Sequence, residues 1–357
     1  MTARTPLTGP SVWKGDDIKN SSRWIRDLAP SHIDALDAAL KAVQGKNWAE
    51  LTRATFPLKG FEDLAADIAE ELENGSGIMK LRGFPVEHYG EDDLRRMYYG
   101  LGTHIGTPVF QNRTGELMRA IRDEGAHVGR TYGQTRDQKG GTFLSSYART
   151  LTNGGLRFHT DRTDVVGLLC VRQAMKGGVS TIASTPAIHN AILAKRPDLL
   201  DALFTDYWRS RFGEEGTGKD GSSTTRATAY PLPIFGVVDG KFTSHYSLTF
   251  IEAAQLADDI PKLTPAQKEA IDMLMATAQE LCFEMTLEPG DLQLINSHVT
   301  YHGRTPFEDD ADSGHDRLLL RLWLTMANNR PLPAGHEVLW QSIEAGQPRG
   351  GIRQVSI

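Results

Sequence analysis

The fold is decided by residues 156–184, which read LRFHTDRTDVVGLLCVRQAMKGGVSTIAS. His159 and Asp161 lie two residues apart in this stretch, and on a β-strand residues i and i+2 point to the same face. An imidazole nitrogen and a carboxylate oxygen would therefore project side by side into one space. Two histidines and one carboxylate on one face of a metal ion leave open coordination positions and suit non-haem Fe(II). The pair therefore predicts part of an iron site that needs a second histidine from elsewhere in the chain.

The second histidine is expected between residues 290 and 305, which read GDLQLINSHVTYHGRT. The run Val299-Thr300-Tyr301 favours a strand, and on this interpretation His302 is the remaining metal ligand. The alternative is a helix, on which His298 and His302 would share one face, as in helical zinc sites. No glutamate directly follows His298, so we expect the strand and His302.

Residues 316–324 read DRLLLRLWL and predict a strand that carries two arginines on one face. Arg317, Leu319, Arg321 and Trp323 alternate along it and would point the same way. Two inward arginines in an apolar strand are costly unless each meets an anion, and guanidinium groups hold carboxylates in bidentate fashion. A dicarboxylate cosubstrate and an acidic substrate would satisfy both. The alternative is that both arginines point outward and the leucines of the other face form the core.

The composition is that of an ordinary soluble globular protein, with 357 residues, a net charge of −6 and 39% hydrophobic residues. Because no Lys/Arg cluster is present, we expect neither nucleic acid nor an anionic membrane surface as a partner. Cys170 and Cys282 each have apolar neighbours, which favours buried free thiols and a reducing compartment. The N-terminus has no apolar signal core, and the apolar run near the motif is too short to span a bilayer. These features predict a cytoplasmic protein, and a homo-oligomer stays open.

Helices are predicted first and at intervals, with short strands between them. Periodicity and capping signals place helices at residues 31–43, 61–72, 91–101, 186–195, 198–204 and 264–281. Runs of β-favouring residues place strands at residues 78–81, 283–287, 292–295 and 318–324. Thr264 and Gln267 can form a capping box around Pro265, which gives the last helix its start. This order favours a β-barrel or sandwich with helices packed outside it, in one domain.

Several segments are expected to lie outside these elements. Residues 1–30 read as an irregular arm, and residues 331–357, rich in Pro and Gly, read as an extended tail. Residues 129–141 are polar and rich in turns, so we expect a loop and a candidate lid. Residues 213–223 read as a flexible surface insertion. Together with residues 206–230, the candidate lid is expected to shape a substrate pocket.

Taken in order, these motifs resemble those of one family. The chain is similar to the taurine dioxygenase (TauD/TfdA-like) branch of the Fe(II)/2-oxoglutarate-dependent oxygenases from about Ile78 to Pro333. The resemblance rests on the ordered set His159-Thr160-Asp161, Gly177-Gly178-Val179-Ser180, Gly290-Asp291, His302-Gly303-Arg304 and the pair Arg317 and Arg321. A His-x-Asp tripeptide occurs by chance, whereas the whole ordered set is specific.

The resemblance implies a mixed α+β, mainly β fold. This fold is a double-stranded β-helix, or jelly roll, of the clavaminate synthase-like kind, with helices packed outside the barrel. A single oxygenase domain would span residues 1–357, with the arm at 1–30, the jelly-roll core at about 78–333 and the tail at 334–357.

The resemblance also implies the chemistry. His159, Asp161 and His302 would hold Fe(II) and be the catalytic residues of an Fe(II)/2-oxoglutarate-dependent dioxygenase that uses O2 and releases succinate and CO2. Related halogenases lack the carboxylate, so that chloride takes its place. The presence of Asp161 therefore indicates hydroxylation of a substrate C–H bond, with desaturation or cyclisation by the same C–H-cleaving chemistry as the alternative.

Three further residues receive roles by resemblance. Arg317 matches the arginine that binds the distal carboxylate of 2-oxoglutarate. Ser180 matches a Thr or Ser that hydrogen-bonds the same carboxylate, and the alternative is a plain turn residue. Arg321 matches a position that often grips an anionic group of the prime substrate, which predicts a small carboxylate or amino-acid-like substrate.

Two other classes of function compete with the oxygenase. A non-catalytic metal-binding jelly-roll module would explain the metal ligands but not Arg317 and Arg321. A zinc hydrolase would use His298 and His302, and it would be active with zinc.

Overall fold

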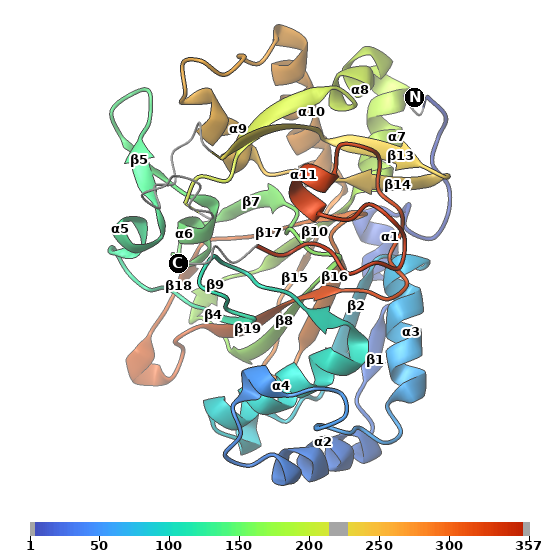
Figure 1. The fold of residues 1–357 in the computed structure, drawn as a ribbon, viewed down its shortest axis with the longest axis vertical. Coiled ribbons are helices and arrows are strands. Elements are labelled where there is room, and N and C mark those ends of the chain that lie inside the picture. The colour runs from blue at the N-terminus through green and yellow to red at the C-terminus, as the bar shows by residue number, and fades with distance from the viewer. Residues whose placement is uncertain (1–3, 214–227, 353–357) are drawn as a thin grey trace.

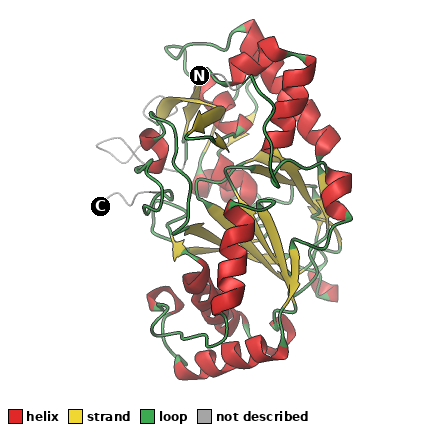
Figure 2. Ribbon diagram, turned by 90° about the vertical axis from the view of Figure 1, so that its right-hand side faces the viewer, coloured by secondary structure: helices red, strands yellow, loops and turns green. Residues whose placement is uncertain are grey.

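Two sheets lie next to each other in the middle of the molecule, and helices cover both outer sides (Figure 1, Figure 2). This computed structural model of the chain describes residues 4–213 and 228–352. The predicted surface insertion at 213–223 falls almost entirely outside the described residues. None of the helices in the described ranges combines the length and the apolarity needed to cross a bilayer.

The larger sheet has seven strands. In spatial order they are β1 (Ile25–Asp27), β2 (Ile78–Arg82), β16 (Leu292–Asn296), β8 (Val165–Arg172), β19 (Leu318–Thr325) and β3 (Thr107–Pro108), and β4 (Met118–Ile121) also pairs with β19. The central strand β8 is a continuous apolar run because β16 and β19 pair on either side of it and most of its residues are buried.

The smaller sheet has four strands, in the order β15 (Phe283–Met285), β10 (Ser180–Ser184), β17 (Thr300–Arg304) and β7 (Leu156–His159). Four two-stranded units complete the strands: β5 (Gln134–Arg136) with β6 (Thr142–Leu144), β9 (Lys176–Gly177) with β18 (Phe307–Glu308), β11 (Asp206–Ser210) with β12 (Ala229–Pro233), and β13 (Phe235–Val238) with β14 (Lys241–Ser244). Of the two architectures that the strand pattern favours, a barrel or a sandwich, no closed barrel is found among the described strands. They form separate sheets, and β15 and β7 end the smaller sheet without a further partner strand.

The helices fall into two main groups, one on each sheet. The larger sheet carries α2 (Pro30–Ala42), α3 (Glu62–Glu73) and α4 (Glu91–Ile105), whose apolar faces share one core with it. The smaller sheet carries α7 (Thr185–Lys195), α8 (Pro197–Leu203) and α10 (Pro265–Leu281). The remaining helices are α1 (Gly15–Lys19), α5 (Val128–Tyr132), α6 (Ser146–Thr150), α9 (Leu248–Gln255) and α11 (Glu337–Trp340), with short 3₁₀ turns at Trp48–Glu50, Val86–His88 and Ala311–Ser313.

Helix α10 shows why the sequence signal was readable. The Thr264 hydroxyl accepts a hydrogen bond from the Gln267 amide at 3.2 Å, and the Thr264 amide donates to Gln267 Oε1 at 3.1 Å. These are the two bonds of a capping box, and they use backbone donors that a helix start leaves unpaired. Ile271, Leu274 and Ala278 then lie buried in the core beneath the helix, as their spacing predicts.

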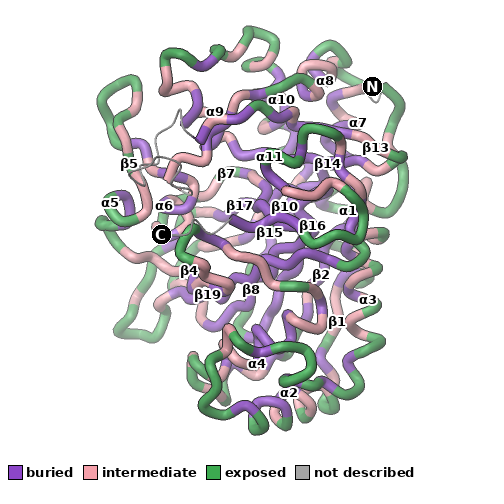
Figure 3. The backbone as a smooth tube through the Cα atoms, in the orientation of Figure 1, coloured by how far each residue is buried: buried purple, intermediate pink, exposed green. Residues whose placement is uncertain are grey.

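Burial is concentrated in the strands and in the faces that the helices turn toward them (Figure 3). The tail shares in this core, since Trp340 and Arg349 are each 1% exposed. The arm shares in it as well, because Trp13 and Trp24 are buried against Phe283 of β15. Both ends of the described chain are therefore built into the fold, although their sequences carry little periodicity.

Four expectations need correction. The arm contains α1 and β1, because β1 gains its hydrogen bonds from β2, whose paired residues lie 55 positions further along the chain. Residues 129–141 form part of α5 and the β5–β6 hairpin rather than a structureless loop. The tail contains α11. Cys170 is a buried free thiol as predicted, whereas the free thiol Cys282 is only half-buried.

Candidate metal centre and cosubstrate cavity

Two neighbouring strands of the smaller sheet bring the predicted metal ligands together. His159 ends β7 and His302 lies on β17, and the two are register partners with ring centroids 4.3 Å apart. Asp161 follows β7, and its carboxylate oxygens lie 3.8 Å from His159 Nε2 and 3.9 Å from His302 Nε2. One donor atom from each residue lies within 4.8 Å of the others, so all three donors face one point.

Each imidazole turns one ring nitrogen toward this point. His159 Nδ1 hydrogen-bonds the Arg157 carbonyl at 2.9 Å, which leaves Nε2 directed at Asp161. Burial, and next the nearby His159, lower the pKa of His302 to about 3. Burial alone would raise the pKa of Asp161, but the charge of Arg321 and the two histidines bring it below its usual value. A carboxylate and two neutral imidazoles are the protonation states that bind a metal ion, so the residues fit an iron ion.

Asp161 is held in place by β19. Trp323 donates its indole N–H to Asp161 Oδ2 at 3.0 Å, and Arg321 Nη1 lies 3.8 Å from the same oxygen. Arg321 in turn donates from Nε to Gln111 Oε1 at 2.7 Å, and Gln111 returns a bond from Nε2 to the Arg321 carbonyl at 2.8 Å. Gln111 was not found from the sequence, because it lies 210 residues away and no local pattern marks it.

His298 is engaged elsewhere and does not join this group. Its Nε2 lies 2.9 Å from Asp164 Oδ1 and its Nδ1 lies 2.9 Å from Thr243 Oγ1. The run before His302 forms β17, as the strand interpretation predicts. The paired zinc site that would need His298 and His302 on one helical face is therefore absent from the described part of the chain.

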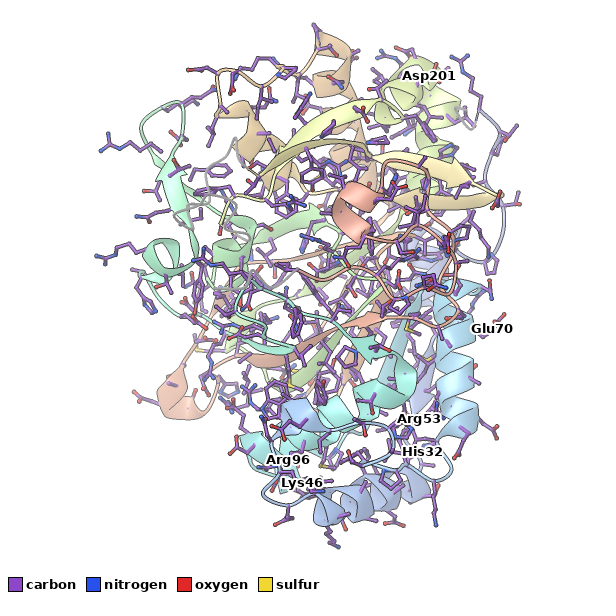
Figure 4. The ribbon with its side chains drawn as sticks, viewed as in Figure 1. His32, Lys46, Arg53, Glu70, Arg96 and Asp201 are labelled. Atoms are coloured by element: carbon purple, nitrogen blue, oxygen red, sulfur yellow. The ribbon has the colours of Figure 1, made fainter. Side chains whose placement is uncertain are left out.

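His32 is likewise accounted for by local structure. It lies among the helices outside the larger sheet (Figure 4), where its Nδ1 accepts a hydrogen bond from the Ala29 amide at the start of α2. Its ring packs on Phe61 at 4.7 Å between centroids. Its role is to cap a helix.

Asp164, three residues after Asp161, fixes the segment that follows β7 through a network of buried hydrogen bonds. Its carboxylate accepts hydrogen bonds from Arg349 Nε at 2.8 Å, Asn329 Nδ2 at 2.8 Å, Thr325 Oγ1 at 3.0 Å and the Met326 amide at 3.0 Å. Burial would raise the pKa of Asp164, but its hydrogen bond with His298 and the charge of Arg349 hold it well below the usual range. The tail is thus tied to the segment that carries Asp161, and no local sequence pattern predicts this contact.

A cavity between the two sheets joins the metal centre to several charged groups. Its polar lining includes His159, Asp161, Ser180, Gln293, His302, Arg304, Arg317 and Arg321. Arg317 and Arg321 are 6% and 5% exposed, so the interpretation that they point outward is wrong. Ser180 lies in β10 opposite Arg304 of β17 and is also buried. The structure therefore brings all six predicted site residues to one cavity.

Arg317 enters this cavity without a partner for its charge. In the described ranges its side chain forms no hydrogen bond or ion pair, and its Nη1 is buried and unsatisfied. Its Cζ lies 5.1 Å from the Phe307 ring centroid, and burial lowers the pKa of Arg317 to about 10. Gly178 has a φ of +68°, and a Cβ there would lie 3.0 Å from Arg317 Nε, so the Gly177-Gly178 turn makes room for the guanidinium. A buried, unpaired cation of this kind is suited to an anion.

Two histidines and one carboxylate are the metal ligands of the two-histidine, one-carboxylate class of non-haem iron proteins. Here they lie beside buried guanidinium groups. The model of the family described as "Taurine catabolism dioxygenase TauD, TfdA family" matches residues 41–323, and the chain belongs to that family. It is an Fe(II)/2-oxoglutarate-dependent oxygenase with O2 as co-reactant. This confirms the resemblance, the enzyme class and the cofactors that the motifs predict.

The relatives include well-covered chains. FR-33289 synthase from Streptomyces rubellomurinus is 33% identical over 339 residues, covering 92% of this chain and 93% of the relative. The structure of an asparagine oxygenase with Fe(II), 2S,3S-3-hydroxyasparagine and succinate has a TM-score of 0.62 at 17% identity and covers 85% of this chain and 93% of its own. The non-haem iron oxygenase OrfP with Fe and α-ketoglutaric acid has a TM-score of 0.58 at 16% identity and covers 84% and 94%. These two structures are similar in fold.

Proposed function

We propose that this oxygenase oxidises a C–H bond of a small anionic substrate, carboxylate or amino-acid-like, by hydroxylation. The observation that carries the proposal is the charge of the cavity. Its lining contains three guanidinium groups, those of Arg304, Arg317 and Arg321, against the single carboxylate of Asp161. The cavity is positive before a divalent metal ion is added, and a site with this excess of buried positive charge favours anionic ligands. Desaturation or cyclisation of the same substrate class is the alternative reaction.

His159, Asp161 and His302 would hold the iron, which when bound supplies the O2 activation that converts 2-oxoglutarate to succinate and CO2 and cleaves the substrate C–H bond. Trp323 and Arg321 fix the carboxylate of Asp161, and the Arg157 carbonyl fixes the ring of His159. Such contacts orient ligands and tune their basicity.

Arg317 and Ser180 would bind the distal carboxylate of 2-oxoglutarate. Arg317 supplies an unsatisfied guanidinium, and Ser180 supplies a hydroxyl from the facing sheet. Arg321 would bind the anionic group of the prime substrate. It is anchored by Gln111 and lies beside Asp161, so an anion that it holds would be positioned next to the metal.

The remaining features of the molecule are proposals of the same kind. We infer that the two sheets are the two halves of a double-stranded β-helix, and that residues 1–357 form one oxygenase domain. The two free cysteines support a reducing, cytoplasmic compartment. Two structures of similar fold hold modified amino acids, an asparagine oxygenase with hydroxyasparagine and OrfP with (3S)-hydroxy-L-Arg, and this supports an amino-acid-like substrate.

The metal assignment is tested by binding. His159→Ala, Asp161→Ala and His302→Ala should each remove most Fe(II) binding in anaerobic titration, whereas His298→Ala should retain it. Loss of iron on His298→Ala alone, in protein that is still folded, would overturn the ligand set.

The reaction is tested by screening the iron-loaded enzyme with acidic metabolites and amino acids for substrate-dependent succinate release. A non-catalytic module would release none with any of them.

The roles of Arg317 and Arg321 are distinguished by following the charge-transfer band of anaerobic Fe(II) protein during 2-oxoglutarate titration. Arg317→Ala should weaken this binding by tens of fold, and Arg321→Ala should spare it while uncoupling succinate release from product. Equal weakening by both would contradict the division of roles.

A further inference from the structure

A third arginine of the cavity, Arg304, has no assigned role and no partner for most of its donors. It is 7% exposed, and its Nε and Nη1 are buried without a hydrogen-bond acceptor. Only Nη2 is satisfied, by the carbonyls of Thr152 at 2.7 Å and Gly154 at 2.5 Å. No carboxylate in the described ranges forms an ion pair with it. A buried guanidinium in this state is costly unless a ligand supplies the missing acceptor.

Its position places it at the cosubstrate end of the cavity. Arg304 lies two residues after His302 on β17, so both side chains point to the same face. Two residues of a strand span about 7 Å, which is on the scale of a five-carbon dicarboxylate extending away from the metal. Ser180 is the register partner of Arg304 on β10, and both residues line the cavity.

One aromatic ring ties Arg304 to Arg317. The Cζ of Arg304 lies 4.7 Å from the centroid of Phe307, and the Cζ of Arg317 lies 5.1 Å from it. Both guanidinium groups therefore lie near the same ring, Arg304 from the end of β17 and Arg317 from the residue just before β19, and both have buried nitrogens without acceptors. Two like charges this close repel each other unless an anion lies within reach of both.

We propose that Arg304 is a second arginine for the distal carboxylate of the cosubstrate, so that this carboxylate is bound by Arg304, Arg317 and Ser180 together. The proposal rests on the proposed function of Arg317. It implies that the enzyme selects 2-oxo acids by the charge at their far end. A 2-oxo acid of the same length that lacks this charge would leave two buried cations unpaired.

A structural role for Arg304 is the competing explanation, because its Nη2 holds the backbone at Thr152 and Gly154. The two roles separate when two ligands of equal length are compared on anaerobic Fe(II) protein: 2-oxoglutarate and 2-oxopentanoate, which carries a methyl group in place of the distal carboxylate. Binding is followed by the charge-transfer band, so no turnover is needed.

Arg304→Met should raise the Kd of 2-oxoglutarate about 30-fold or more, since charge-assisted hydrogen bonds in a dry site are strong. The same variant should leave the Kd of 2-oxopentanoate within about twofold. Arg304→Lys should retain part of the 2-oxoglutarate affinity, because it keeps the charge but not the fork of donors. Arg196→Met, at an exposed ion pair on the surface, is the matched control and should change neither constant.

An equal rise in both constants would show that Arg304 only holds the backbone, and an unchanged 2-oxoglutarate constant would also refute the proposal. Arg317→Met, measured in parallel, distinguishes its failure from that of the proposed function. If Arg317→Met weakens 2-oxoglutarate and Arg304→Met does not, the second arginine is wrong; if Arg317→Met has no effect, the cosubstrate site itself is wrong. If Arg304→Met does not fold, Arg304→Lys is compared with the wild type in the same way. Equal Kd values of 2-oxoglutarate for the two proteins would show that the guanidinium group of Arg304 does not bind the distal carboxylate through its several N–H donors.

Discussion

Replacing Arg349 by methionine should destabilise the protein although Arg349 lies far from the metal centre in sequence. The Arg349 side chain is fully buried and Asp164 is 3% exposed, so the pair is hidden from solvent. The substitution removes the bond from Nε to Asp164 at 2.8 Å and the bond from Nη1 to the Arg330 carbonyl at 2.6 Å. Asp164 would keep its neutral hydrogen-bond donors but lose the cation that pairs with it.

Removing one partner of a buried ion pair costs about 3–5 kcal/mol, because the other charge stays buried and uncompensated. We expect Arg349→Met to lower the free energy of unfolding by about 3 kcal/mol, the lower end of this range. The reason is that His298, Thr325 and Asn329 still donate hydrogen bonds to Asp164. This is a large share of the roughly 5–15 kcal/mol by which folded domains are usually stable.

The assay is urea unfolding at neutral pH, followed by tryptophan fluorescence. Arg196→Met at the surface is the control for the loss of an arginine as such. Adding Asp164→Asn to Arg349→Met should recover part of the lost free energy, because asparagine carries no charge to leave unpaired. A single variant that loses less than about 1 kcal/mol, or a double variant no more stable than the single one, would refute the reasoning.

Three further predictions concern the site and its surroundings. Trp323→Phe removes the indole bond to Asp161 and should weaken Fe(II) binding about 10–100-fold, measured by anaerobic titration; unchanged affinity would show that the bond does not position the ligand. Gly178→Ala places a Cβ 3.0 Å from Arg317 Nε at a φ of +68°, and it should raise the 2-oxoglutarate Kd with little effect on Fe(II) binding; an unaltered Kd would exclude the turn from the cosubstrate site. Burial lowers the pKa of His298 to about 4, whereas an unfolded histidine titrates near 6.5. As the pH falls from about 6.5 to about 4, the unfolded chain therefore takes up a proton that the folded protein does not, and stability should fall by as much as about 3 kcal/mol; urea midpoints should decline over this window in wild type and decline less in His298→Gln.

The parts of the molecule that could be predicted are those whose signal is local. The capping box at Thr264 lies within four residues, and the pair His159 and Asp161 is set by the two-residue period of a strand. His302 was reachable because its own neighbours favour β-structure over helix. In each case the residues near in sequence also determine which way the side chains point.

The parts that could not be predicted depend on partners far away in the chain. Asp164 and Arg349 are 185 residues apart, and the sequence around either residue does not predict their contact. The same holds for Gln111, which meets Arg321 only because β19 passes beside it. Strand β1 is too short for its sequence to show a strand pattern, and it forms because it pairs with the edge of β2. The sequence could not decide between a barrel and a sandwich, because strand propensity says nothing of which strand edges remain unpaired.

The order of strands in the smaller sheet has a consequence for how the enzyme is made. His302 follows Asp161 by 302 − 161 = 141 residues, yet β17 lies between β10 and β7, both of which leave the ribosome much earlier. The last of the three predicted iron ligands therefore arrives by insertion between two strands already synthesised, a non-local step of the kind that folds slowly. A nascent chain can offer iron one histidine and one carboxylate but not the full set. Iron should therefore bind only after the chain has been synthesised and folded.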